Sequence, residues 1–222
     1  MPPEETARTI EVKICGLDRA ASVDAAIAGG ARYTGFVFYP PSPRNLGPGA
    51  ARALTERVPA GIIRVALFVD PSDDDIARVL DQNRFDIIQL HGGESAGRVA
   101  EIRGQTGLQV MKAVKLASPQ DLAAAADYHA AADRLLFDAL APGDMAGALP
   151  GGNALAFDWD LLAGAQVALP WMLAGGLTAD NLAEAVARSG ASQVDVSSGV
   201  EDAPGIKSLE KIRAFLAAAA MI

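Results

Sequence analysis

The chain has 222 residues, half of them hydrophobic, with 22 glycines and 13 prolines, which suits one globular domain over residues 1–222. Its formal net charge of −8 disfavours a nucleic-acid partner, because nucleic-acid phosphates attract basic surfaces. The single cysteine excludes an intrachain disulfide, no apolar run approaches the roughly 18 residues of a membrane span, and the first residues carry no secretion signal, so we expect a cytoplasmic protein without membrane contact.

Short apolar runs alternate with alanine-rich helical runs along the whole chain. The first run is rich in β-branched residues, and Gly16 allows the turn into the first helix. Ser118 followed by proline is typical of a helix start. Strands are expected at 9–15, 33–38, 62–69, 86–90, 109–114, 134–138, 171–174 and 193–196. Helices are expected at 19–28, 50–57, from about 73, 94–105, 118–131, 159–164, 179–189 and 207–220.

This alternation predicts a parallel sheet covered by helices, because its strands are apolar on both faces. Eight strand–helix units are the number that closes a (βα)8 TIM barrel, which is the predicted fold class. A doubly wound open sheet is the alternative, but the turn after the first strand lacks the Gly-x-Gly-x-x-Gly pattern typical of that fold.

Four reactive side chains follow strand ends and would therefore meet at one rim of a barrel. Cys15 ends the first strand and Asp138 ends the sixth, where an apolar setting favours a protonated carboxyl that acts as an acid. Arg44 lies in a proline-stiffened loop, and His91 follows the fourth strand. Taken singly, each has a plainer reading: a buried thiol, a capping carboxylate, a solvated charge and a structural histidine.

Glycine-rich turns follow the last two strands. Gly175 and Gly176 come after the seventh strand, and Ser198 and Gly199 come after the eighth. Small residues let the backbone approach an anion, so two such turns side by side predict a phosphate site. The preceding segment 139–156 is rich in glycine, alanine and proline, and loops of this length are often functional.

Two charged residues are expected inside the barrel. Lys13 shares a strand face with Cys15, where an ammonium group would increase the thiolate fraction. Asp195 shares a face with Ser197, opposite Val194. The two strand faces therefore suggest a buried pair of Lys13 with Asp195.

Six short motifs are spread in order over nearly the whole chain. They are Lys-Ile-Cys-Gly at 13–16, Gly-Phe-Val-Phe-Tyr at 35–39, Gln-Leu-His-Gly at 89–92, Phe-Asp-Trp at 157–159, Ala-Gly-Gly-Leu at 174–177 and Asp-Val-Ser-Ser-Gly-Val-Glu at 195–201. Together they resemble the phosphoribosylanthranilate isomerase family of tryptophan biosynthesis. The resemblance implies a (βα)8 barrel, no cofactor or metal, and an Amadori rearrangement of N-(5-phosphoribosyl)anthranilate to the 1-deoxyribulose 5-phosphate.

The resemblance also implies residue roles. Cys15 would be the general base, Asp138 the general acid, and Arg44 the residue that binds the anthranilate end. The turns carrying Gly175, Gly176, Ser198 and Gly199 would hold the phosphate, and His91, Gly152 and Asn153 would contact the substrate. The loop before residue 157 departs from many family members, because it lacks the lysine found there.

Three other functions compete with this assignment. A related imidazole-ribonucleotide isomerase would use an aspartate where Cys15 stands, and an indole-glycerol-phosphate synthase would need a catalytic lysine and a longer N-terminal extension. A non-catalytic barrel that binds a phosphorylated ligand as a sensor or scaffold would be indifferent to loss of the thiol. The expected partner is a small phosphorylated substrate, and the chain is expected to be a monomer or a homodimer.

Overall fold

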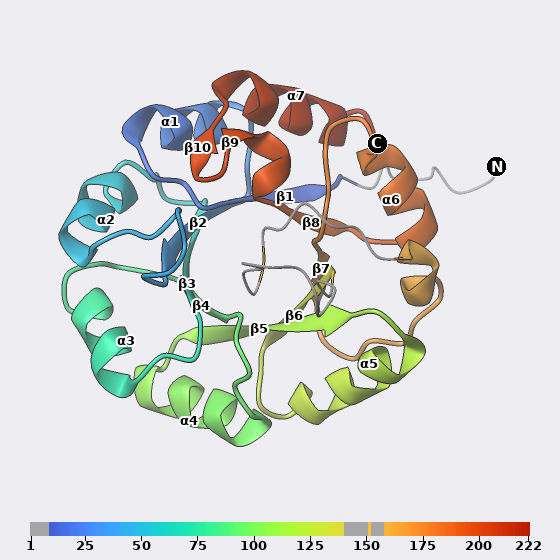
Figure 1. Cartoon of the computed structure of the whole chain (residues 1–222), viewed down its shortest axis with the longest axis horizontal. Coiled ribbons are helices and arrows are strands. Elements are labelled where there is room, and N and C mark those ends of the chain that lie inside the picture. Colours follow the sequence, from blue (N-terminus) through green and yellow to red (C-terminus); the bar gives the residue numbers. More distant parts are fainter. Residues whose placement is uncertain (1–8, 140–150, 152–157) are drawn as a thin grey trace.

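The computed structural model describes residues 9–139, 151 and 158–222, and its centre is a closed barrel of eight parallel strands (Figure 1). Each strand pairs with its neighbours in sequence, and the first strand closes the ring by pairing with the eighth. The strands are β1 Glu11–Cys15, β2 Tyr33–Phe38, β3 Ile63–Phe68, β4 Ile87–Leu90, β5 Gln109–Leu116, β6 Arg134–Ala139, β7 Trp171–Leu173 and β8 Gln193–Val196. The predicted (βα)8 fold class is therefore confirmed.

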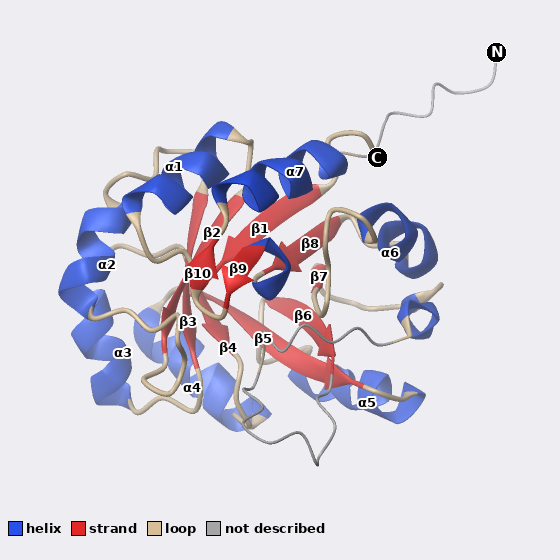
Figure 2. Ribbon diagram, turned by 45° about the horizontal axis from the view of Figure 1, so that its top comes forward, coloured by secondary structure: helices blue, strands red, loops and turns tan. Residues whose placement is uncertain are grey.

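Helices surround the barrel as an outer ring, blue around the red strands in Figure 2. They are α1 Ala20–Ala28, α2 Pro48–Thr55, α3 Asp73–Leu80, α4 Ala96–Thr106, α5 Pro119–Ala124, α6 Leu182–Ser189 and α7 Leu209–Ala219, with short 3-10 helices η1 Ala125–Tyr128, η2 Trp159–Leu162 and η3 Ser198–Val200. Serine side chains cap the starts of several helices; Ser72, for example, accepts from the backbone N–H of Asp75. None of the helices within the described ranges is long and apolar enough to span a membrane.

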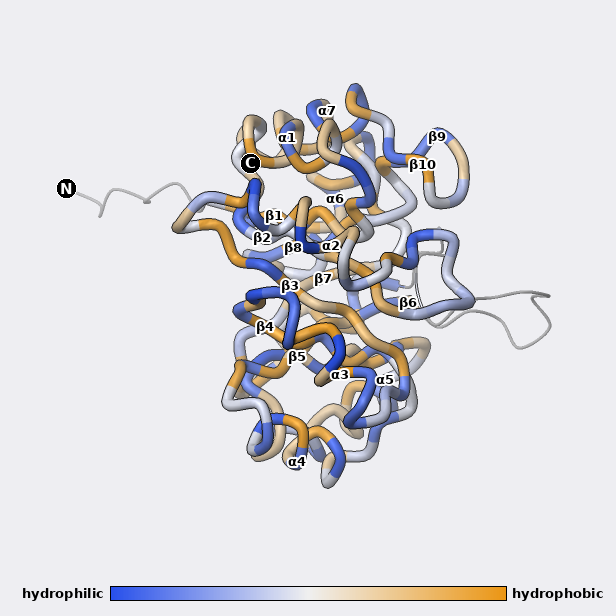
Figure 3. The backbone as a smooth tube through the Cα atoms, turned by 90° about the vertical axis from the view of Figure 1, so that its left-hand side faces the viewer, coloured by the Kyte–Doolittle hydropathy of each residue, from blue (hydrophilic) through white to orange (hydrophobic). Residues whose placement is uncertain are grey.

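Strand side chains alternate between two cores. Outward-facing residues such as Ile14, Phe36 and Val194 pack against the helices in the larger core. Inward-facing residues such as Val65 and Met111 form a second, smaller core that fills the barrel. Orange and blue segments alternate along α4 in Figure 3, as expected for a helix that buries one side on the barrel. This alternation decides which residues reach the mouth of the barrel.

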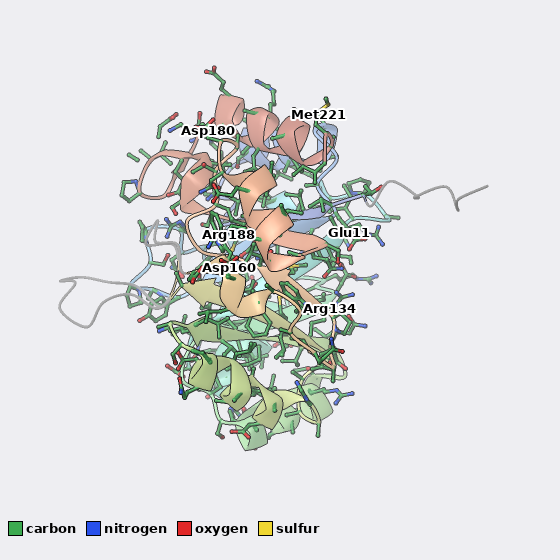
Figure 4. The ribbon with its side chains drawn as sticks, turned by 90° about the vertical axis from the view of Figure 1, so that its right-hand side faces the viewer. Glu11, Arg134, Asp160, Asp180, Arg188 and Met221 are labelled. Carbon is green, nitrogen blue, oxygen red and sulfur yellow. The ribbon has the colours of Figure 1, made fainter. Side chains whose placement is uncertain are left out.

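Polar side chains close the barrel at the amino-terminal ends of its strands. The Tyr33 hydroxyl donates to the Glu11 carboxylate at 3.0 Å, and the Gln193 amide donates to the same carboxylate at 2.6 Å. Arg134 lies over the Tyr33 ring, and Figure 4 shows Glu11 and Arg134 on the same side of the molecule. These contacts leave the opposite, carboxyl-terminal end as the open mouth.

Several elements differ from the sequence-based predictions. The helix expected at 118–131 is divided into α5 and η1, and the helix expected at 159–164 is the 3-10 helix η2. Arg188 of α6 pairs with Asp158, which precedes η2, and with Asp160 within η2. It also lies over the Trp159 ring, and Figure 4 labels Arg188 next to Asp160. The hairpin β9 Glu201–Ala203 with β10 Ile206–Lys207 was not predicted, because its strands are too short to show a period. Most of the long loop expected at 139–156 lies outside the described residues.

Candidate active site

A cavity that is open to solvent lies at the carboxyl-terminal ends of the strands. All predicted site residues that the structure describes line it: Cys15, Arg44, His91, Asp138, Gly175, Gly176, Ser198 and Gly199. The remaining two, Gly152 and Asn153, lie outside the described residues. Figure 1 shows β1 and β6 on different walls of the barrel, so the thiol of Cys15 and the carboxyl of Asp138 approach the cavity from different sides.

Cys15 is buried at the end of β1, with its side chain toward the barrel axis. Burial raises the pKa of its thiol above the ordinary value, and the nearby Lys13 ammonium only partly opposes this effect. The expectation that Lys13 increases the thiolate fraction is thus correct in direction, but desolvation is the larger effect in the ligand-free site.

Lys13 and Asp195 form the buried pair that the strand faces suggested. Their positions are in register across β1 and β8, and Nζ lies 2.9 Å from Oδ1 of Asp195. Burial lowers the pKa of Lys13, but Asp195 and Cys15 more than compensate, so that the pKa is raised. The Lys13 ammonium, paired with Asp195, therefore lies directly beneath Cys15.

Asp138 is buried at the end of β6, and each of its carboxyl oxygens has a hydrogen-bond partner. Its Oδ1 accepts from the backbone N–H of Ala139 at 2.9 Å, and its Oδ2 lies 3.1 Å from Nε2 of His91. Two glycines cover the carboxylate closely: a Cβ atom on Gly151 would lie 2.9 Å from Oδ2, and one on Gly175 would lie 3.1 Å from Oδ1. The backbone of Gly151 and Gly175 therefore lies against the two carboxyl oxygens of Asp138, where a larger residue would not fit.

Arg44 is held by residues whose role the sequence analysis did not anticipate. Its guanidinium donates to both carboxylate oxygens of Glu201, at 2.7 and 2.8 Å, in a bidentate pair. Lys207 donates to the same carboxylate at 2.7 Å and to the carbonyl of Ser197 at 2.9 Å. Burial would raise the pKa of Glu201, but Arg44 and Lys207 lower it below its ordinary value. Glu201 is the last residue of the motif at 195–201, and this position was the sequence signal that could have assigned it to the site.

The two glycine turns have the backbone geometry that small residues permit. Gly175 and Gly176 have φ values of 90° and 61°, in the left-handed region that side chains rarely adopt. A Cβ atom on Gly199 would collide with the carbonyl oxygen of Leu177. The two turns therefore pack directly against each other, and both line the cavity.

Gln89 is a further residue that the sequence analysis left without a role. It is fully buried on the inner face of β4, and its Nε2 lies 3.0 Å from Nδ1 of His91. The available signal was its position two residues before His91, because residues two apart on a strand share a face. Within the described ranges, no group of three or more histidine, cysteine or acidic side chains could hold a metal ion.

Comparison with known proteins decides the family. The family model for N-(5'phosphoribosyl)anthranilate (PRA) isomerase matches residues 12–218. The chain belongs to this family. N-(5'-phosphoribosyl)anthranilate isomerases of Paracoccus denitrificans (55% identical) and Rhodospirillum centenum (56% identical) cover 95% and 96% of this chain, and the matches span 97% and 99% of those proteins.

Solved structures of the family have the same fold. The phosphoribosyl anthranilate isomerase of Thermotoga maritima superposes with a TM-score of 0.84 at 31% identity, over 96% of this chain and 100% of that one. A second structure of the family, with a TM-score of 0.82 at 30% identity and the same coverage of both chains, holds reduced 1-(o-carboxyphenylamino)-1-deoxyribulose 5-phosphate. Family membership confirms the resemblance read from the motifs and, with it, the prediction of an isomerase of tryptophan biosynthesis.

Proposed function

We propose that the chain converts N-(5'-phosphoribosyl)anthranilate to 1-(2-carboxyphenylamino)-1-deoxyribulose 5-phosphate by general acid–base catalysis, with Asp138 as the acid and Cys15 as the base. The observation that carries the proposal is that both side chains reach one cavity from different strands, beside two glycine turns and an arginine. The related structure holds a reduced form of this product, which supports a site of the same chemistry in this chain.

The reaction needs one proton given and another taken. Asp138 gives its proton to the ribose ring oxygen as the bond from C1′ to that oxygen breaks, and the nitrogen lone pair forms the C=N bond of a Schiff base. The thiolate of Cys15 then removes the proton from C2′, and the electron pair moves through the C=N bond to give an enolamine. The enolamine tautomerises to the ketone. A separate acid and base suit these steps because their pKa values must differ.

The substrate carries two anionic ends, and the cavity offers two kinds of group to bind them. Arg44 is buried and fixed by Glu201, so its guanidinium is ordered before a carboxylate arrives. The turns at Gly175 and Ser198 are expected to hold the phosphate with backbone N–H groups, which requires little net positive charge. Substrate contacts from His91, Gly152 and Asn153 belong to the same proposal.

The first test is turnover of freshly generated substrate, followed by the loss of anthranilate-type fluorescence. Cys15→Ala and Asp138→Asn should each lower kcat by at least ~10²-fold, because a general acid or base contributes about 10²–10⁴-fold. Full activity in either variant would remove that residue from its role. Product binding without turnover in the unmodified protein would favour the non-catalytic barrel instead.

The assembly and location of the protein complete the proposal. A small phosphorylated substrate is its expected partner, and a monomer or a homodimer its expected state; the Thermotoga maritima relative is described as dimeric. We infer a cytoplasmic location from the biosynthetic family. Light scattering after size-exclusion chromatography distinguishes the two oligomeric states.

A further inference from the structure

Gln89, His91 and Asp138 form a continuous hydrogen-bonded chain, of which the proposed mechanism uses only the last member as an acid. Gln89 Nε2 lies 3.0 Å from His91 Nδ1, and His91 Nε2 lies 3.1 Å from Asp138 Oδ2. The side chains come from the inner faces of β4 and β6 and are nearly buried, with 0%, 6% and 5% of their surfaces exposed. These three side chains are therefore surrounded mainly by protein atoms.

The hydrogen bonds from Gln89 through His91 to Asp138 all run in one donor-to-acceptor direction. An amide nitrogen can only donate, so Gln89 Nε2 donates to Nδ1 of His91 and Nδ1 carries no proton. The imidazole proton is then on Nε2, which donates to Oδ2 of Asp138. In this way the partner of one ring nitrogen selects which nitrogen faces the acid with a proton.

The buried end of Gln89 supports this direction. Its Oε1 is buried and has no hydrogen-bond partner among the residues that the structure describes. Rotation of the amide by half a turn would bring Oε1 to Nδ1, but it would place an NH₂ group with two donors in that partnerless position. An unpaired carbonyl oxygen is tolerated more often than an unpaired N–H group. The orientation with NH₂ toward His91 is therefore the less costly one.

We propose that Gln89 is a positioning residue that fixes the tautomer of His91, and thereby the direction in which Asp138 presents its proton. Because His91 Nε2 always donates to Oδ2, the acid's own proton cannot point at the imidazole and is directed into the cavity. After that proton passes to the ribose ring oxygen, the same N–H group stabilises the carboxylate that remains. The inference rests on the proposed role of Asp138 as the acid.

The tautomer can be observed without turnover. Only two histidines are present in the chain, so the full-length protein labelled with ¹⁵N-histidine gives a simple long-range ¹H–¹⁵N spectrum, and His129→Gln assigns the second ring. At neutral pH we expect a protonated Nε2 and an unprotonated Nδ1 in His91. In Gln89→Glu, a carboxylate that can only accept should place a proton on Nδ1. A protonated Nδ1 in the unmodified protein, or an unchanged spectrum in Gln89→Glu, overturns the proposal.

Kinetics then separate positioning from packing. Gln89→Glu keeps the side-chain volume but reverses the hydrogen bond, and we expect kcat to fall by ~10²-fold or more with KM within about threefold, since the wrong histidine tautomer in a serine protease triad costs about 10⁴-fold. Gln89→Met removes the hydrogen bond without reversing it and should lose only about tenfold. His129→Gln, away from the cavity, should keep full activity.

The outcomes are distinct. Equal losses in Gln89→Glu and Gln89→Met, with both proteins folded by circular dichroism, mean a packing role and contradict the proposal. Unchanged kcat in Gln89→Glu contradicts it as well. If instead Asp138→Asn remains active, the proposed acid is wrong, yet the spectrum of the His91 ring still tests whether Gln89 sets the tautomer.

Discussion

Replacement of Lys13 by methionine tests whether this buried cation controls the base. A Cβ atom on Gly35 would lie 3.0 Å from Lys13 Nζ and 3.2 Å from Cys15 Sγ, so the two atoms are no more than about 6 Å apart. With an effective dielectric constant of about 20, a unit charge at about 6 Å stabilises a thiolate by roughly 3 kcal/mol, or about 2 pKa units. Lys13→Met should therefore raise the pKa of the thiol by about 2 units.

Asp195 requires a second variant, because it would remain as an unpaired buried carboxylate. The attraction of Lys13 for the thiolate exceeds the repulsion by Asp195, which lies behind the ammonium. Lys13→Met/Asp195→Asn removes both charges and should raise the thiol pKa by less than Lys13→Met does, since part of the lost attraction is offset by the lost repulsion. The double variant also avoids the stability cost of a single buried charge.

The assay is simple because Cys15 is the only cysteine in the chain. The ultraviolet absorbance of the thiolate, or the rate of alkylation by iodoacetamide, is followed against pH, with Cys15→Ser as the blank. The acidic limb of the pH–rate profile should move upward by the same amount as the thiol pKa. A thiol pKa that is the same in all three proteins, or lower in Lys13→Met, would refute the reasoning.

Three further predictions concern binding and stability. Arg44→Ala should raise KM by roughly 10–100-fold with a smaller change in kcat, because a hydrogen bond to a charged group contributes about 1.5–3 kcal/mol. Gly199→Ala should raise KM and the inhibition constant of inorganic phosphate, because its Cβ collides with the neighbouring turn, whereas Gly104→Ala, with open space around it, should change neither. Glu94→Gln should lower the free energy of unfolding in urea by ~3–5 kcal/mol, because it breaks the buried pair with Lys112. The pKa of Glu94 is lowered in the folded state despite its burial, so its contribution is complete above its ordinary value of 4.5 and is lost as the pH falls below that value; unfolding midpoints against pH check this sign.

Periodicity predicted the barrel well because the signal is repeated. Each strand shows the same apolar run, and glycine or a serine cap marks many of the boundaries. The number of strands could therefore be counted from the sequence, and the pairing of β1 with β8 closes the ring as that number predicts. The hairpin of β9 and β10 could not be predicted in this way. Its strands have three and two residues, too few to establish a period, and its position depends on contacts such as Gly205 against Pro43 from a distant loop.

The site residues also divide into those that the sequence predicts and those that depend on tertiary packing. Cys15, Asp138 and the glycine turns could be found because strand ends converge in any barrel of this kind. The pairing of Arg44 with Glu201 could not, because it joins residues separated by 157 positions through side chains alone. The thiol pKa also depends on burial of Cys15, and desolvation is a property of the packed structure rather than of neighbours in sequence.

One strand rule nevertheless connects reactive residues with those that adjust them. Side chains two positions apart share a face, so each residue at the mouth has a residue of its own strand directly beneath it. Lys13 lies beneath Cys15, Gln89 beneath His91 and Asp195 beneath Ser197, and all three lower residues are polar and almost fully buried. Burial of a polar side chain costs stability unless its hydrogen bonds or ion pairs compensate for the lost contact with water. Polar residues two positions before a strand-end reactive group are thus the first place to look for control of its protons.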